Sequence, residues 1–366
     1  MHGVTLAGSE LGELALPELN APLNDRLYRS LCWAISGRWG EVDWEAFSSA
    51  EWKRLIGLAP GEGVAPLLYC ALQSAGVRPP AAAMQVLMDE YYRTAAQNTL
   101  LLNELECILH SLAKAGVPVI VLKGASLTRS VYSDPALRPM NDLDLLIPPH
   151  CVGRALSCLQ NCGYAVEKIT YHVMLQGGPQ QLVTLELHWT LPDVPPAVSG
   201  EVLEWLFALP EGDPGRSVFE FLYLCAHLIL QHAANAPRLI WFYDLYLLAE
   251  RQSLPAVESL AVELGWQSVL AAALQGLAAR FGISPLWHLD VTALSLSLDA
   301  QQQRIRRWML SALQALPWVD RLRMLIGFLF PSPAYLRWRY QPRPSWLWPL
   351  GYARRWGEMA RESIHG

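Results

Sequence analysis

The segment that most constrains the fold runs from residue 117 to residue 148. It opens with an apolar run rich in β-branched residues, 117–122, which predicts a buried strand. Gly124 then permits a tight turn, and Ser126 stands where it can cap or line the first turn of a helix. Pro135 ends that helix, and a second strand is expected over residues 141–147. This order predicts a small sheet with a helix packed on it.

The second strand carries two acidic residues on one face. Asp142 and Asp144 are two residues apart, so their side chains point the same way. Adjacent carboxylates repel each other, and a divalent cation removes that cost. Carboxylate oxygens suit Mg²⁺, or Mn²⁺ in its place, usually together with substrate phosphates. An isolated Asp-x-Asp pair is more often a solvated strand edge, so the neighbouring motifs decide.

Two neighbouring motifs favour a phosphate and metal site. The strand, turn and helix upstream offer backbone N–H groups and a helix N-terminus to phosphate. Downstream, residues 184–189 predict a third strand in which Glu186 and His188 share one face and two leucines share the other. An amphipathic strand at a sheet surface would give the same alternation. The acidic pair upstream is what favours Glu186 as a third metal ligand.

Together these motifs resemble the nucleotidyltransferase superfamily, which has the DNA polymerase β-like fold. Its pattern is a glycine turn, an acidic pair spaced by one residue, and a third carboxylate on a later strand. The closer resemblance is to an uncharacterised bacterial nucleotidyltransferase family, whose four motifs are present at residues 123–124, 132–139, 142–144 and 186–189. The chain departs from the superfamily at Ala125, where Gly or Ser usually follows the turn glycine; the hydroxyl of Ser126 comes one residue later.

The resemblance implies a metal-dependent enzyme that moves a nucleoside monophosphate from an NTP to an acceptor and releases pyrophosphate. Asp142, Asp144 and Glu186 would be the catalytic metal ligands, holding Mg²⁺ or Mn²⁺. The sequence does not identify the NTP, the oligomeric state or the acceptor, which could be a small molecule, a peptide or a protein.

Further residues are expected to contact the nucleotide. A lysine that enters the turn can reach a triphosphate as a point charge, and Arg138 can either bind phosphate or pair with a core carboxylate. His188 is expected to contact substrate or to hydrogen-bond a metal ligand. The expected nucleotide-binding residues are Lys123, Gly124, Ala125, Ser126 and Arg138.

Helical periodicity on both sides of these motifs predicts an α+β fold, with a small mixed sheet as the nucleotidyltransferase core. We expect an N-terminal helical region over residues 1–115, the core over residues 116–196 and a C-terminal helical region over residues 197–366. Within the first region, residues 43–47 are expected to start one helix and residues 82–115 to form a long one.

Three polar residues of the C-terminal region are expected to be structural. His227 and His232 are five apart on a predicted helix and do not share a face well, so they are expected to be core or cleft histidines rather than metal ligands. Asp244 stands among aromatic residues and is expected to be a buried acid paired with His227 or Arg238.

Composition bounds the partners and the compartment. A net charge of −5 argues against a general nucleic-acid binder. The seven cysteines form no Cys-x-x-Cys pair, which favours reduced thiols in a cytoplasmic protein. No uncharged apolar run reaches the length of a membrane span, so we expect no transmembrane segment.

The end of the chain supports an alternative function. Residues 321–366 hold eight arginines, no lysine and four tryptophans, a composition that suits interfaces. The alternative is a non-catalytic scaffold with a nucleotidyltransferase-like fold that binds a partner or a membrane surface. In either case we expect this segment to pack on the core or on a partner, because four tryptophans in water would form an exposed apolar patch.

Overall fold

The computed structural model describes residues 25–169, 172–178, 182–192, 196–232, 237–282, 313–330 and 349–354, together with residues 23, 194, 356 and 357. Residues 331–348, which carry Trp338, Trp346 and Trp348, lie outside the described residues. No helix in the described ranges is both long enough and apolar enough to cross a membrane.

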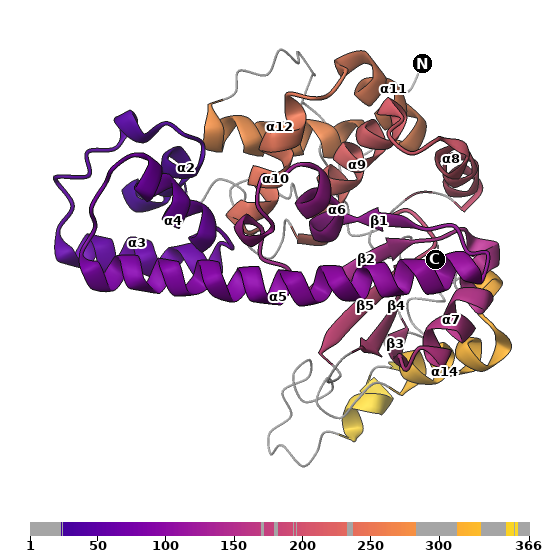
Figure 1. Cartoon of the computed structure of the whole chain (residues 1–366). Coiled ribbons are helices and arrows are strands. Elements are labelled where there is room, and N and C mark those ends of the chain that lie inside the picture. Colours follow the sequence, from indigo (N-terminus) through magenta and orange to yellow (C-terminus); the bar gives the residue numbers. More distant parts are fainter. Residues whose placement is uncertain are drawn as a thin grey trace, which may run out of the picture.

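The N-terminal region consists of helices, the last of which is very long. They are α2 (Arg26–Ile35), α3 (Ser49–Gly61), α4 (Ala65–Ser74) and α5 (Ala81–Lys114). Helix α5 confirms the long predicted helix, and Figure 1 shows it running past the N-terminal helices at one end and the sheet at the other. The prediction that a helix starts at residues 43–47 is wrong. Ser48 and Glu51 form a capping box that starts α3 later instead.

The core is a five-stranded mixed sheet in the order β1-β2-β5-β4-β3. Strands β2 and β5 are parallel, and the other neighbouring pairs are antiparallel. The parallel pair lies in the middle of the sheet, and both strands carry the acidic motifs. The strands are β1 (Ile120–Leu122), β2 (Asp142–Leu146), β3 (Ala165–Ile169), β4 (Val173–Gly177) and β5 (Val183–His188).

The two faces of the sheet have different neighbours. Leu143 and Leu145 of β2 belong to a buried cluster with α5 and α7 (Val152–Asn161). Leu146, which shares the opposite face with Asp142 and Asp144, belongs to the cluster formed by the N-terminal and C-terminal helices. The acidic face of the sheet is therefore turned toward the helical part of the molecule.

The C-terminal helices pack with the N-terminal ones in one hydrophobic core. Arg38 Nη1 donates to the Phe281 carbonyl at 2.9 Å, and the guanidinium of Arg280 lies 3.6 Å from the centre of the Phe242 ring. The predicted α+β fold with helical regions on both sides of a small sheet is confirmed; the three domain boundaries stay predictions. The helices are α8 (Pro196–Ala208), α9 (Pro214–Ala226), the π-helix η6 (His227–His232), α10 (Leu239–Ala249), α11 (Leu254–Leu264) and α12 (Gln267–Phe281).

One further helix, α14 (Trp318–Leu329), packs on the sheet region rather than on the helical core. Met324 and the nearby Leu316 are buried in the same cluster as α5 and α7. Trp356 Nε1 donates to the Leu329 carbonyl at 2.8 Å. The described parts of the chain's end therefore pack on the protein and on each other.

Candidate active site

The three predicted metal ligands lie on neighbouring parallel strands. The register of β2 and β5 places Asp144 opposite Glu186 and Asp142 opposite Thr184. Ligand oxygens of Asp142, Asp144 and Glu186 all lie within 4.8 Å of one another. Residues 42 or more positions apart in the chain thus converge because the pairing of the two strands sets their carboxylates side by side.

A lysine in an unusual backbone conformation faces these carboxylates. Lys123 has φ of 52°, the only positive φ of a non-glycine residue in the described part of the chain. Side chains disfavour this left-handed region, and such strain concentrates at functional sites. Its Nζ lies 2.7 Å from Asp144 Oδ1 and 3.7 Å from Glu186 Oε2. The tight turn predicted at Gly124 is therefore made one residue earlier, by the lysine itself.

Gly124 is required for packing rather than for its backbone freedom. A Cβ there would lie 3.0 Å from Met140 Cγ and 3.1 Å from Arg138 Nη1, closer than most side-chain contacts. Helix α6 (Lys123–Ser130) begins at the turn, and its N-cap residue, Leu122, has no side-chain oxygen to accept from the first-turn N–H groups. Those amides of Lys123, Gly124 and Ala125 belong to a helix N-terminus of the kind that binds phosphate.

The hydroxyl of Ser126, in the same first turn, has an acidic partner that sequence reasoning missed. It hydrogen-bonds Glu220 of α9, and burial raises the pKa of Glu220 to about 6. The two residues are far apart in the chain, and no spacing pattern links them. A residue of helix α9 therefore contacts the turn.

The neighbouring charges shift the pKa values of the carboxylates in different directions. Burial and the repulsion of Asp144 raise the pKa of Asp142 to about 6. Burial would also raise the pKa of Asp144, but Lys123 and a hydrogen bond from His188 outweigh it and hold that pKa well below its usual range. Burial would lower the pKa of Lys123, but the carboxylates raise it above its usual value. The site therefore contains more negative charge than Lys123 neutralises.

Two histidines flank the carboxylates. His188 is buried, and its Nε2–H donates to Asp144 Oδ1 at 2.9 Å, with Glu186 Oε2 at 3.5 Å. His172, just before β4, places Nε2 3.5 Å from Glu186 Oε1. Burial and the neighbouring His188 lower the pKa of His172 to about 4, so its ring is neutral at pH 7. His172 lies outside the four sequence motifs, and only the position of β4 beside β5 reveals it.

His227 and His232 lie side by side, although the sequence predicted that they would not share a helix face well. Residues five apart diverge on an α-helix, but η6 is a π-helix, whose hydrogen bonds span five residues. The two Nε2 atoms therefore lie 3.1 Å apart, and Trp241 lies against His232 with ring centres at 4.1 Å. Burial and the charge of Lys123 lower the pKa of both histidines, which places this pair near the carboxylate site.

Arg138 was expected either to bind phosphate or to pair with a core carboxylate, and in the structure it pairs with a core carboxylate. Its Nη2 donates to Asp244 Oδ2 at 2.7 Å, its Nε lies 3.1 Å from Oδ1, and its Nη1 donates to the Pro139 carbonyl. The Tyr132 hydroxyl donates to Asp244 Oδ1 at 2.6 Å. The expectation that Asp244 pairs with His227 or Arg238 is wrong, because Arg138 reaches it from the loop before β2.

The donor set fits a hard divalent cation. Mg²⁺ binds oxygen at 2.0–2.1 Å in octahedral geometry, so its opposite ligands are about 4.2 Å apart. Neighbouring ligands in the same geometry are about 3 Å apart, so the three carboxylate oxygens, which lie within 4.8 Å of one another, would move closer together to bind one cation. A second group, formed by His172, Glu186 and His188, meets the same distance limit. The two groups share Glu186, so this carboxylate belongs to both candidate ligand sets.

Comparison with known proteins agrees with this geometry. A family model described as an uncharacterised nucleotidyltransferase matches residues 48–282. The matched segment begins at the N-cap of α3, ends at the glycine after α12 and includes the whole sheet. No curated protein and no solved structure gives a match.

Proposed function

Because the chain belongs to the uncharacterised nucleotidyltransferase family, we propose that it transfers a nucleoside monophosphate from an NTP to an acceptor and releases pyrophosphate. The observation that carries this proposal is the convergence of Asp142, Asp144 and Glu186 on adjacent parallel strands, beside the first turn of α6. A non-catalytic scaffold would need neither three carboxylates on one face of the sheet nor a strained lysine beside them.

The carboxylates would hold the cation, Mg²⁺ or Mn²⁺. When bound, the ion would polarise the phosphate and stabilise the charge that develops on it. His188 fixes the orientation of Asp144 through the 2.9 Å hydrogen bond, as partners of metal ligands commonly do. Because the side chain of His188 is almost fully buried, we assign it this orienting role rather than a contact with substrate.

The start of α6 would bind the phosphates. The first-turn amides of Gly124 and Ala125 belong to a helix N-terminus with no side-chain cap. The Ser126 hydroxyl, which bonds Glu220 in this structure, would add a donor by turning to the phosphate. Lys123 carries a positive charge next to this turn and can pair with a phosphate oxygen in place of Asp144.

Arg138 has a different part in this proposal. Its guanidinium is engaged by Asp244 and Pro139, and its own carbonyl accepts from Asn98 Nδ2 at 2.8 Å. We assign it the task of holding residues 139–141, which lead into β2, in position. It would therefore support the carboxylates without touching phosphate.

A labelling experiment tests the proposal. The purified protein is incubated with Mg²⁺ or Mn²⁺, a cell extract that supplies acceptors, and each of the four NTPs labelled at the α-phosphate. The proposal expects the label of at least one NTP to appear on an acceptor together with pyrophosphate. Absence of labelled product with every NTP and both cations would contradict it.

A further inference from the structure

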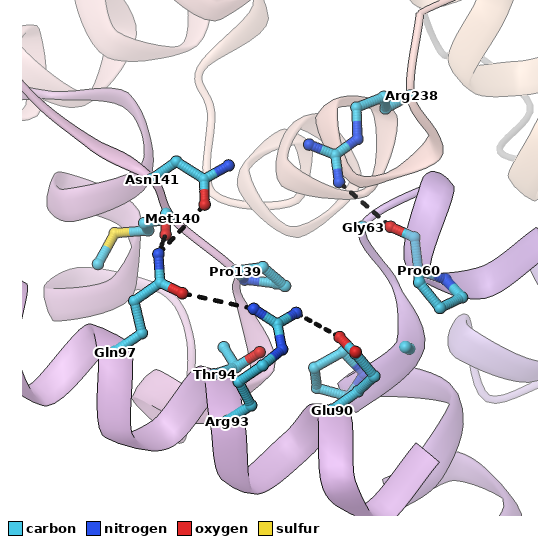
Figure 2. A pocket seen from close by; sticks show the side chains of 12 residues that line it. Pro60, Gly63, Glu90, Arg93, Thr94, Gln97, Pro139, Met140, Asn141 and Arg238 are labelled. Atoms are coloured by element: carbon cyan, nitrogen blue, oxygen red, sulfur yellow. Dashed lines mark hydrogen bonds and ion pairs between the residues drawn. The ribbon is translucent and has the colours of Figure 1, made fainter. Parts of the chain in front are cut away.

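A cavity of about 290 Å³ lies between the N-terminal helices and the chain that leads into β2. Its walls come from the corner between α3 and α4, from one side of α5, from residues 139–141 and from Arg238, just before α10 (Figure 2). Its volume is near the lower end of the range typical of small-molecule sites. Of the nucleotidyltransferase motifs, only the one at residues 132–139 reaches it, through Pro139.

Two arginines give this cavity a positive charge. Arg238 donates from Nε to the Gly61 carbonyl at 2.9 Å and from Nη2 to the Pro60 carbonyl at 3.4 Å. In the described part of the chain no carboxylate forms an ion pair with it. Arg93, on α5, pairs with Glu90. Figure 2 shows the two guanidinium groups on opposite sides of the cavity. With one acid and two arginines in its lining, the cavity carries an excess of positive charge.

Within the described ranges, the charge of Arg238 is compensated only at a distance, by Glu62. Glu62 attracts it without forming an ion pair among the described residues, and the Oε2 of Glu62 accepts from the Leu239 N–H at 2.7 Å. Burial and the nearby Arg138 lower the pKa of Arg238. A negatively charged group beside the guanidinium would relieve both effects.

Neutral polar groups complete the lining. Thr94 is only 2% exposed, and among the described residues its hydroxyl has no hydrogen-bond partner. Buried hydroxyl groups normally have one, so an unpaired hydroxyl in a cavity wall marks a place where a ligand or a water completes the bonding. Gln97 and Asn141 also face the cavity, and Gln97 Nε2 donates to Asn141 Oδ1 at 3.1 Å (Figure 2).

Gly63 shows how closely the corner approaches Arg238. Its φ is +73°, and a Cβ there would lie 2.8 Å from Arg238 Nη2 and 2.9 Å from Ile240 Cγ2. Only glycine combines that backbone conformation with so close an approach. The local sequence is thus adapted to fixing the guanidinium at the cavity wall.

We propose that this cavity binds a small molecule bearing an oxyanion, a phosphate ester or a carboxylate, between Arg238 and Arg93, with Thr94 as an additional partner. Guanidinium groups pair well with both kinds of oxyanion. The site is separate from the carboxylates. Gln97 connects its wall to β2 through the Met140 carbonyl, and Met140 packs against Gly124. An occupant would therefore stabilise the segment that carries the metal ligands, and its binding does not depend on transferase activity.

The test uses the full chain without NTP or divalent cation, titrated calorimetrically with inorganic phosphate and with citrate. We expect binding of at least one anion. Arg93→Gln and Arg238→Gln should each weaken it about tenfold or more, because a hydrogen bond to a charged group contributes at least ~1.5 kcal/mol. Thr94→Val should weaken it less. Arg54→Gln, which changes an exposed arginine outside the cavity, is the matched control and should leave binding unchanged.

Lys123→Met, first shown by circular dichroism to be folded at the titration temperature, separates this site from the proposed phosphate turn. An anion in the cavity binds this variant as tightly as wild type, whereas an anion at the start of α6 does not. Arg238 donates hydrogen bonds to two backbone carbonyls, so Arg238→Gln could misfold. The side chain of Arg93 is 59% exposed, and Arg93→Gln then serves as the test variant. Absence of binding of both anions to wild type would overturn the proposal. So would loss of binding in Lys123→Met with full binding in Arg93→Gln.

Discussion

The ammonium group of Lys123 lies 2.7 Å from Asp144 Oδ1, in a site where three carboxylates meet. In the absence of a metal ion this lysine supplies the closest positive charge to Asp144, and it adopts a strained left-handed backbone conformation to do so. The pair explains how the protein can hold a cation site together before a cation binds.

Lys123→Ala is therefore expected to destabilise the metal-free protein. Removing one partner of a buried ion pair leaves an uncompensated charge, which costs about 3–5 kcal/mol. Mg²⁺ should restore much of this loss, because the ion replaces the missing charge. Thermal unfolding with and without Mg²⁺ measures both effects, and the exposed Lys114→Ala is the control. A melting temperature that Lys123→Ala leaves unchanged would show that the lysine does not neutralise the site.

The buried pair of Arg138 and Asp244 leads to a second prediction. Arg138→Gln should lower the free energy of unfolding by about 3–5 kcal/mol, because Asp244 would stay buried without its cation. Adding Asp244→Asn should recover part of the loss, since both charges are then absent. Urea unfolding of the two single variants and the double variant tests this. If Arg138→Gln keeps full stability and loses affinity for NTP, the arginine binds phosphate after all.

Glu220 predicts a dependence of stability on pH. Burial raises its pKa from 4.5 to about 6, so the folded protein binds a proton that the unfolded chain releases. This contribution to stability is complete below about pH 4.5 and is lost as the pH rises through 6. At pH 7 Glu220→Gln should be more stable than wild type by about 1–2 kcal/mol, and the difference should vanish near pH 4.5.

Urea unfolding of both proteins between pH 4.5 and pH 7 gives this difference directly. Glu263→Gln, at an exposed position of α11, controls for the loss of a carboxylate as such. A difference between wild type and Glu220→Gln that stays constant over the pH range would mean that Glu220 is equally charged in the folded and unfolded states.

Much of the core could be predicted from local pattern. Leucines alternate with polar residues in β2 and β5, and this alternation assigns Asp142, Asp144 and Glu186 to faces of their strands. The family motifs supplied the expectation that these strands meet, and their register bears it out. Local pattern was sufficient because each strand has one apolar face.

Other features depend on contacts that no local pattern encodes. The left-handed turn falls on Lys123 rather than Gly124 because the lysine gains two carboxylate partners from β2 and β5. The π-helical turn that joins His227 to His232 looks like an ordinary helix in sequence. Arg138 and Asp244 are 106 residues apart, and an arginine in a proline-flanked loop could equally have faced a phosphate.

Asp142 allows the sharpest test of the central claim. Its pKa is raised to about 6 by burial and by repulsion from Asp144, so the charge of Asp142 opposes folding at pH 7. Asp144 differs, because its charge is already paired with Lys123. Asp142→Asn should therefore keep or raise the melting temperature of the metal-free protein while removing a ligand that a cation needs.

The decisive measurement compares wild type with Asp142→Asn in the transfer of an α-phosphate label from NTP to an acceptor, at pH 7 with Mg²⁺ and cell extract. The exposed Asp89→Asn on α5 is the control. We predict that Asp142→Asn melts no lower than wild type and transfers label at least about a hundredfold more slowly, and that Asp89→Asn matches wild type in both. Transfer by Asp142→Asn at the wild-type rate would contradict the account.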